Sequence, residues 1–200
     1  SSVTMQLCYL QGDADACQRI QRNANGQLWV GTGNVVDLNV NIGGVETSGF
    51  DISAAYGFDM GTYGSLNLSM NGTLLDSFDV DPVGNAAYAY DCVGKYGNDC
   101  FTPTPEWRHR ARASWVTPVD GLDLSATWRY IGSADLDTGV TGRVDSTLEE
   151  QNYIDLAGQW AARDWVSFRF GVNNVLDDDP PLSASTGTTG NGNTYPQTYD

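Results

Sequence analysis

Residues 165–181 read WVSFRFGVNNVLDDDPP, and this stretch decides the fold class. Large apolar residues alternate with polar or small ones from Val166 to Asn173. Because side chains of a strand point alternately to its two faces, the stretch predicts a strand with one apolar and one polar face. The acidic run and the prolines that follow predict a loop.

The same alternation recurs upstream and predicts further strands at about 45–58, 65–78, 107–116, 122–130 and 152–160. Short turns at DMGTYG, TPVDG and AARD alternate with long loops at 79–105, at 133–150 and after 174. The apolar faces of these strands carry Phe50, Ile52, Leu66, Leu68, Leu124, Trp128, Ile154, Leu156, Phe168 and Phe170.

This pattern favours an all-β fold, an antiparallel up-and-down transmembrane β-barrel segment with long extracellular loops and short periplasmic turns. Tryptophans near the strand ends also favour it, because amphipathic rings gather where a membrane meets water. The alternative is a secreted soluble β-sandwich, a carbohydrate-binding or glycosidase domain. We expect residues 1–34, which hold the first cysteine pair, to be an extracellular loop region and residues 35–200 to form the barrel strands.

The charge and the distribution of apolar residues exclude some classes of function. The chain has 25 acidic and 10 basic residues and a net charge of -15, which argues against nucleic-acid binding because phosphate would be repelled. No apolar run approaches the roughly 20 residues of a membrane-spanning helix, whereas a barrel strand needs only about 9–11.

The four cysteines fall into two local pairs, Cys8 with Cys17 and Cys92 with Cys100, each in a Gly-, Asp- and Asn-rich stretch. This spacing predicts two small disulfide-closed loops in an oxidising compartment, with buried free thiols as the alternative. A zinc site normally has closer cysteine pairs with histidine support, and His109 is the only histidine.

Several segments, taken in order, resemble one family. They are VETSGFDISAAYGF at 45–58, CVGKYGNDC at 92–100 followed by TPTPEWRHRARASWVTP, FRFGVNNVLDDDPP at 168–181 and NTYPQTYD at the C-terminus. Their order and spacing are similar to the C-terminal third of the barrel of TonB-dependent outer-membrane receptors. The resemblance covers most of residues 35–200.

The resemblance implies a place in the Gram-negative outer membrane and active uptake of a scarce nutrient: a siderophore, cobalamin or an oligosaccharide. In that family a barrel of about 22 strands surrounds an N-terminal plug domain. The implied partners are the lipid bilayer, the plug and remaining strands of the same protein, TonB through the N-terminal part, and an unidentified small-molecule ligand. The resemblance implies that residues 35–200 are a partial C-terminal barrel, about six strands of a larger one. We expect this chain to be a fragment that lacks the plug and the last strand.

The candidate site residues are structural or binding residues. We expect no catalytic residue, metal site or cofactor, although Asp177, Asp178 and Asp179 could bind calcium through their oxygens. Five arginines on the polar strand faces would line the lumen, where pairing with acidic residues of a plug or wall is favoured over an anionic ligand. They are Arg108, Arg110, Arg112, Arg129 and Arg169. Tyr88, Tyr90 and Tyr96 are candidate ligand-loop aromatics, with loop packing as their alternative role.

Overall fold

The computed structural model describes residues 2–36, 43–82, 84, 86–183 and 196–199, in two units. The first unit comprises residues 1–46 and 79–91, and the second comprises residues 47–78 and 92–200. Strands dominate the described residues and most of their pairings are antiparallel, which confirms the all-β class.

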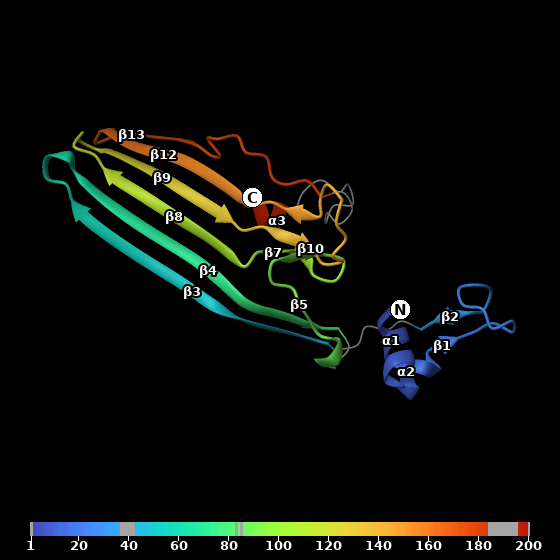
Figure 1. Ribbon diagram of the computed structural model, residues 1–200. Helices are drawn as coiled ribbons and strands as arrows, with labels where there is room; N and C mark the ends of the chain where they lie inside the picture. The colour runs from blue at the N-terminus through green and yellow to red at the C-terminus, as the bar shows by residue number, and fades with distance from the viewer. Residues whose placement is uncertain (1, 37–42, 83, 85, 184–195, 200) are drawn as a thin grey trace. The chain divides into compact units, whose positions relative to one another are not determined.

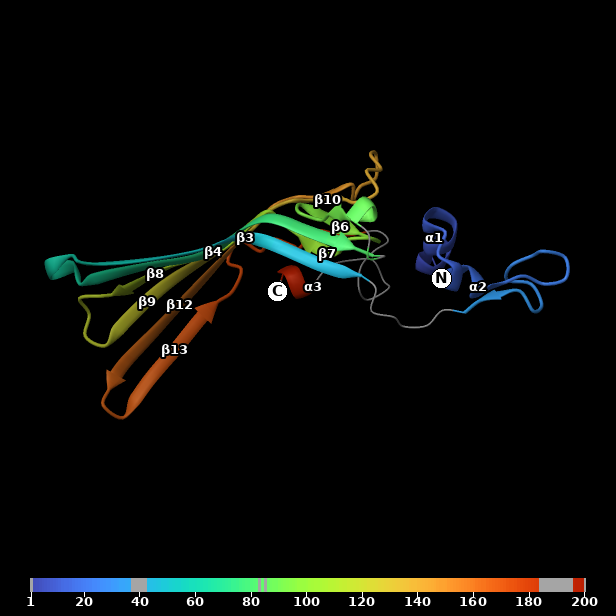
Figure 2. The ribbon, with the colours of Figure 1, turned by 90° about the horizontal axis from the view of Figure 1, so that it is seen from below.

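A seven-stranded sheet forms most of the second unit (Figure 1). Its strands follow the order β13–β12–β9–β8–β4–β3, and β5 pairs with β4. In Figure 2 the strands fan apart from β3 to β13, as the usual twist of a sheet requires. Within the described residues the sheet is open, with β3 and β13 at its edges. The strands are β3 (Gly44–Asp59), β4 (Ser65–Asp81), β5 (Tyr90–Asp91), β8 (Trp107–Val116), β9 (Leu122–Ile131), β12 (Gln151–Arg163) and β13 (Val166–Val172).

Three short turns join consecutive strands into hairpins. The 3-10 helix η1 (Gly61–Tyr63) links β3 to β4, residues 117–121 link β8 to β9, and residues 164–165 link β12 to β13. Gly121 has a φ of 70°, and a Cβ there would lie 2.5 Å from the backbone oxygen of Ala161. Glycine is therefore required where this turn approaches β12.

A second, four-stranded sheet lies in the long connections, in the order β11–β10–β6–β7. Its buried cluster comprises Tyr96, Ile131, Ala134, Leu136, Leu148, Tyr153 and Tyr199. Ile131 belongs to β9 and Tyr153 to β12, so the large sheet shares this core. The strands are β6 (Lys95–Gly97), β7 (Phe101–Thr104), β10 (Ala134–Leu136) and β11 (Thr147–Leu148), and α3 (Pro196–Tyr199) contributes Tyr199.

These small strands occupy parts of the segments 79–105 and 133–150 that were expected to be irregular loops. The Cys92–Cys100 disulfide closes the β6 region, and both cysteines are buried. Asp137 Oδ2 accepts the backbone N–H groups of Asp99 at 2.7 Å and Cys100 at 3.0 Å. The disulfide and these hydrogen bonds order a segment whose composition alone is typical of a loop.

The N-terminal residues also differ from expectation, because helices occur within the expected loop 1–34. They are α1 (Ser2–Gln11) and α2 (Ala14–Gln18), followed by the paired strands β1 (Ile20–Gln21) and β2 (Asn34–Val35). Asp13 caps α2 by accepting the Ala16 N–H at 2.8 Å, and a disulfide joins Cys8 to Cys17. No helix in the described part of the chain is long and apolar enough to cross a membrane. The first unit also contains η2 (Ala86–Tyr88).

Candidate functional site

The strand registers align the alternating side chains into two continuous faces. One row runs Leu66–Trp115–Leu124–Gly158–Phe170 across β4, β8, β9, β12 and β13. Ser53 of β3 donates a hydrogen bond to Asn71 of β4, and Thr73 of β4 donates one to Asp51 of β3. The odd-numbered residues of β3 and β4 therefore lie on the face opposite to this row. The large sheet is therefore apolar on one side and polar on the other.

The apolar belt, as we name the first face, is exposed. Twelve of its large side chains have exposed fractions between 36% and 68%, although a soluble sheet normally buries its apolar face. The exposed members are Phe50, Ile52, Tyr56, Phe58, Leu68, Trp115, Trp128, Leu156, Trp160, Phe168, Phe170 and Val172. Leu66, Leu124 and Ile154, expected in the same belt, are partly exposed.

Aromatic residues gather at both ends of the belt. At the end with the long connections, Trp107 Nε1 donates to His109 Nδ1 at 2.9 Å, and the His109 ring stacks on Tyr130 with centroids 5.3 Å apart. The Tyr130 hydroxyl donates to Glu150 at 2.7 Å. His109 thus lies in an aromatic cluster on the apolar face.

At the end with the short turns, Trp160 lies 6.2 Å from Phe168 between ring centroids, and Trp115 Nε1 donates to the Tyr63 carbonyl at 2.8 Å. The middle of the belt is aliphatic, with Ala113 opposite Ala126 on β8 and β9. The belt thus has two aromatic ends and an aliphatic middle.

Two glycines on the belt make room for aromatic rings of neighbouring strands. A Cβ on Gly158 would lie 2.5 Å from the Phe170 ring, and one on Gly72 would overlap the Trp107 ring. Each glycine is thus a position where an aromatic side chain lies directly over backbone.

The arginine face, as we name the polar side, carries Arg108, Arg110 and Arg112 on β8, Arg129 on β9 and Arg169 on β13. Arg129 pairs with Asp155 through two hydrogen bonds, Nε to Oδ2 at 3.0 Å and Nη2 to Oδ1 at 3.2 Å. Arg112 donates to the hydroxyls of Ser114 and Ser125. Asp155 also accepts the backbone N–H of Asn174 at 2.9 Å.

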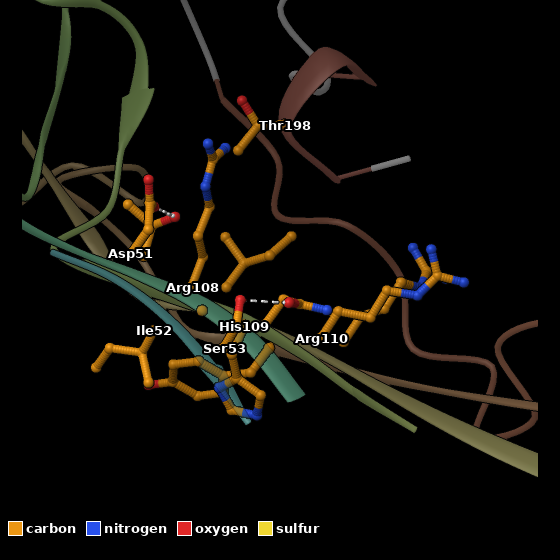
Figure 3. A pocket seen from close by; sticks show the side chains of 13 residues that line it. Asp51, Ile52, Ser53, Arg108, His109, Arg110 and Thr198 are labelled. Atoms are coloured by element: carbon orange, nitrogen blue, oxygen red, sulfur yellow. Dashed lines mark hydrogen bonds between the residues drawn. The ribbon is translucent and has the colours of Figure 1, made fainter. Parts of the chain in front are cut away.

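An open cavity of about 400 Å³ brings three of these arginines together, Arg108, Arg110 and Arg129. Figure 3 shows Arg108 extending from the sheet toward Thr198, while His109 and Ile52 lie on the other side. At its edge Ser53 donates to Asn71 Oδ1 at 2.7 Å. Arg169 lies outside this cavity.

The three candidate tyrosines lie in different places. Tyr88 belongs to η2 and Tyr90 to β5, both in the first unit, and both are half-buried. Tyr96 belongs to β6 in the second unit, is fully buried, and its hydroxyl donates to the Asp145 carbonyl. Tyr96 therefore packs within the small sheet rather than presenting its ring to solvent.

Sequence reasoning missed a buried polar group next to Tyr96. The Asp145 side chain is 1% exposed and receives two hydrogen bonds of 2.8 Å from Arg143. This contact raises the pKa of Arg143 above its ordinary value. The Arg143-Val144-Asp145 spacing is the only sequence signal for the pair, and it is too common to single out.

The described ranges contain no group of three or more His, Cys, Asp or Glu side chains placed to hold a metal ion. Asp177, Asp178 and Asp179 follow a turn in which Asn174 accepts the Asp178 N–H at 3.2 Å and donates to its carbonyl at 2.9 Å. Comparison of the chain with protein-family models, with curated proteins and with solved structures gave no significant match.

Proposed function

We propose that the large sheet is part of the wall of an outer-membrane β-barrel, with the apolar belt facing lipid. The observation that carries the proposal is the exposure of one apolar face across six paired strands. Contiguous exposed apolar surface on this scale is rare in soluble monomers and marks a protein or membrane contact.

Strand length supports a bilayer as the contacting phase. β8 and β9 each have 10 residues. At about 3.3 Å per residue and a tilt of about 40°, such a strand rises about 25 Å, the height of the apolar band on outer-membrane barrels. The aromatic ends of the belt correspond to the two water interfaces, where ring N–H and O–H groups find polar partners.

The soluble sandwich needs a second sheet against the belt. In the described residues the small sheet instead shares its core with Ile131 and Tyr153, which belong to the arginine face. The exposed members of the belt keep exposed fractions of 36% or more, which favours the barrel over the sandwich.

We propose further that the barrel is a TonB-dependent receptor that imports a siderophore, cobalamin or an oligosaccharide. Its arginine face would then line the lumen opposite a plug domain, and the edges of β3 and β13 would pair with further strands, because lipid tolerates no open sheet edge. The resemblance of residues 35–200 to that family supports this assignment.

Partition into membranes tests the barrel. Protein refolded with phospholipid vesicles should float with them through a density gradient and resist extraction by carbonate. Recovery of folded, monomeric protein in buffer without detergent would contradict the proposal.

Uptake tests the receptor. In Gram-negative cells that make the protein, deleting it should abolish accumulation of one labelled nutrient from a panel of ferric siderophores, cobalamin and oligosaccharides. Accumulation that continues after TonB is removed would contradict an energised receptor.

A further inference from the structure

We propose that the arginine face binds a small polyanion, a molecule with two or more carboxylate or phosphate groups, between Arg108, Arg110 and Arg129. The inference deepens the proposed uptake function by naming the class of ligand, and in that respect rests on it. The binding chemistry itself lies on the face opposite the belt and can be tested separately.

Positive charge is crowded at this part of the arginine face. Arg110 and Arg129 are directly opposed in the β8–β9 register, and Arg108 follows two residues away on the same face. Opposed side chains have Cβ atoms about 4.5–5.5 Å apart, so like charges there repel. The chain has only 10 basic residues and a net charge of -15, yet three arginines converge here.

Few carboxylates lie beside these arginines. Asp155 is occupied by Arg129, and Asp51 accepts the Thr73 hydroxyl at 2.8 Å. Among the described residues, neither Arg108 nor Arg110 has a carboxylate within 4.0 Å. Two exposed guanidinium groups therefore make no direct ion pair, and Arg110 interacts with Asp155 only through space, so both can accept an external anion.

The surface between these arginines is hollowed. The cavity of about 400 Å³ lies within the size range of small-molecule sites, and its lining contains three arginines against one aspartate. A guanidinium presents a planar fork that matches a carboxylate or phosphate in two hydrogen bonds. Hydroxyl and amide groups of Ser53, Asn71 and Thr198 border the same space.

Figure 3 also shows what binding must change. The guanidinium groups of Arg108 and Arg110 point in different directions, so at least one side chain must rotate for both to hold one ligand. Because both side chains are exposed, no packed neighbour prevents that rotation. Molecules with several anionic groups then have an advantage over single carboxylates.

Titration calorimetry of the folded chain in neutral detergent tests the proposal, with citrate and pyrophosphate as probes and acetate and sucrose as comparisons. We expect citrate or pyrophosphate to bind at least tenfold more tightly than acetate, and sucrose not to bind. If citrate binds more tightly, the site prefers carboxylate groups; if pyrophosphate binds more tightly, it prefers phosphate groups. If neither citrate nor pyrophosphate binds, the proposal is wrong. The arginines would then pair with carboxylates of a polypeptide instead.

Three variants make the test specific. Arg110→Gln should lower the affinity for the tighter-binding probe by about tenfold or more, as expected for the loss of a charged hydrogen-bonding partner. Asp155→Asn should raise the affinity for the same probe, because Arg129 loses its competing carboxylate. Arg169→Gln removes a charge from the same face outside the cavity and should leave affinity within about twofold. Equal weakening by Arg110→Gln and Arg169→Gln would mean nonspecific attraction and overturn the site.

The unfolding midpoint of each variant is measured alongside the titration. A loss of affinity is then interpreted only for variants that are folded. If the chain floats with vesicles but binds neither probe, this inference fails while the barrel stands. If it binds citrate but does not enter vesicles, the barrel fails and the anion site remains.

Discussion

A single positive charge placed on either face of β12 tests the two-faced sheet. Leu156 lies at mid-strand on the apolar belt with 44% of its surface exposed, between Ala126 and Val172. The next residue, Ala157, lies on the arginine face and is also exposed. Arginine can therefore be introduced at either position without displacing a buried side chain.

The expected magnitudes differ sharply. If the belt faces lipid, Leu156→Arg should destabilise the fold by about 2–4 kcal/mol, the cost of an arginine near the bilayer midplane. That cost corresponds to a change of about 30- to 900-fold in the folding equilibrium constant. Ala157→Arg faces the polar side and should change stability by no more than about 0.5 kcal/mol, as for an ordinary surface substitution.

The assay is reversible denaturant unfolding in phospholipid vesicles, followed by fluorescence of tryptophans such as Trp128 and Trp160. The free energy of unfolding is compared for the wild type, Leu156→Arg and Ala157→Arg. Equal costs for the two arginines, or no cost for Leu156→Arg, would refute a lipid-facing belt. A larger cost for Ala157→Arg would mean that the two faces are assigned the wrong way round.

Two further predictions concern stability. Gly158→Ala should cost about 1–3 kcal/mol in chemical denaturation, because the new methyl would overlap the Phe170 ring, whereas Gly44→Ala, with no atom within 4 Å of its Cβ, should be neutral. A neutral Gly158→Ala would show that the ring does not pack over this backbone. Replacing both cysteines of the Cys92–Cys100 disulfide by serine should cost about 2.5 kcal/mol from the lost loop closure. The same change at the Cys8–Cys17 disulfide should leave the unfolding of the large sheet unaltered, and an equal loss would contradict a local role for each bridge.

Alternation in the sequence was sufficient to predict the long strands, because a period of two is local and each strand keeps it over many residues. The strands predicted at 107–116 and 122–130 differ little from the observed strands Trp107–Val116 and Leu122–Ile131. The small sheet was not predictable in this way. Its strands have 2 to 4 residues, too few to show a period, and β6 pairs in parallel with β10, which is distant in sequence.

The candidate site was predictable only in part. The two-residue spacing of Arg108, Arg110 and Arg112 sufficed to place them on one face. Which arginine meets a carboxylate depends on how β9 aligns with β12 across the long connection 132–150, and no local pattern determines that alignment. Asp155 becomes the partner of Arg129 only through this register.

The alternation of short turns and long connections also bears on the order in which the sheet assembles. The segment between β4 and β8 is roughly fivefold longer than the turn between β8 and β9, and this difference adds about 1.4 kcal/mol to the entropic cost of closing it. Hairpins should therefore form first and then dock side by side. In pulse-labelled hydrogen exchange during refolding, amides bonded between β8 and β9 should be protected before those bonded between β4 and β8, and the reverse order would contradict assembly by hairpins.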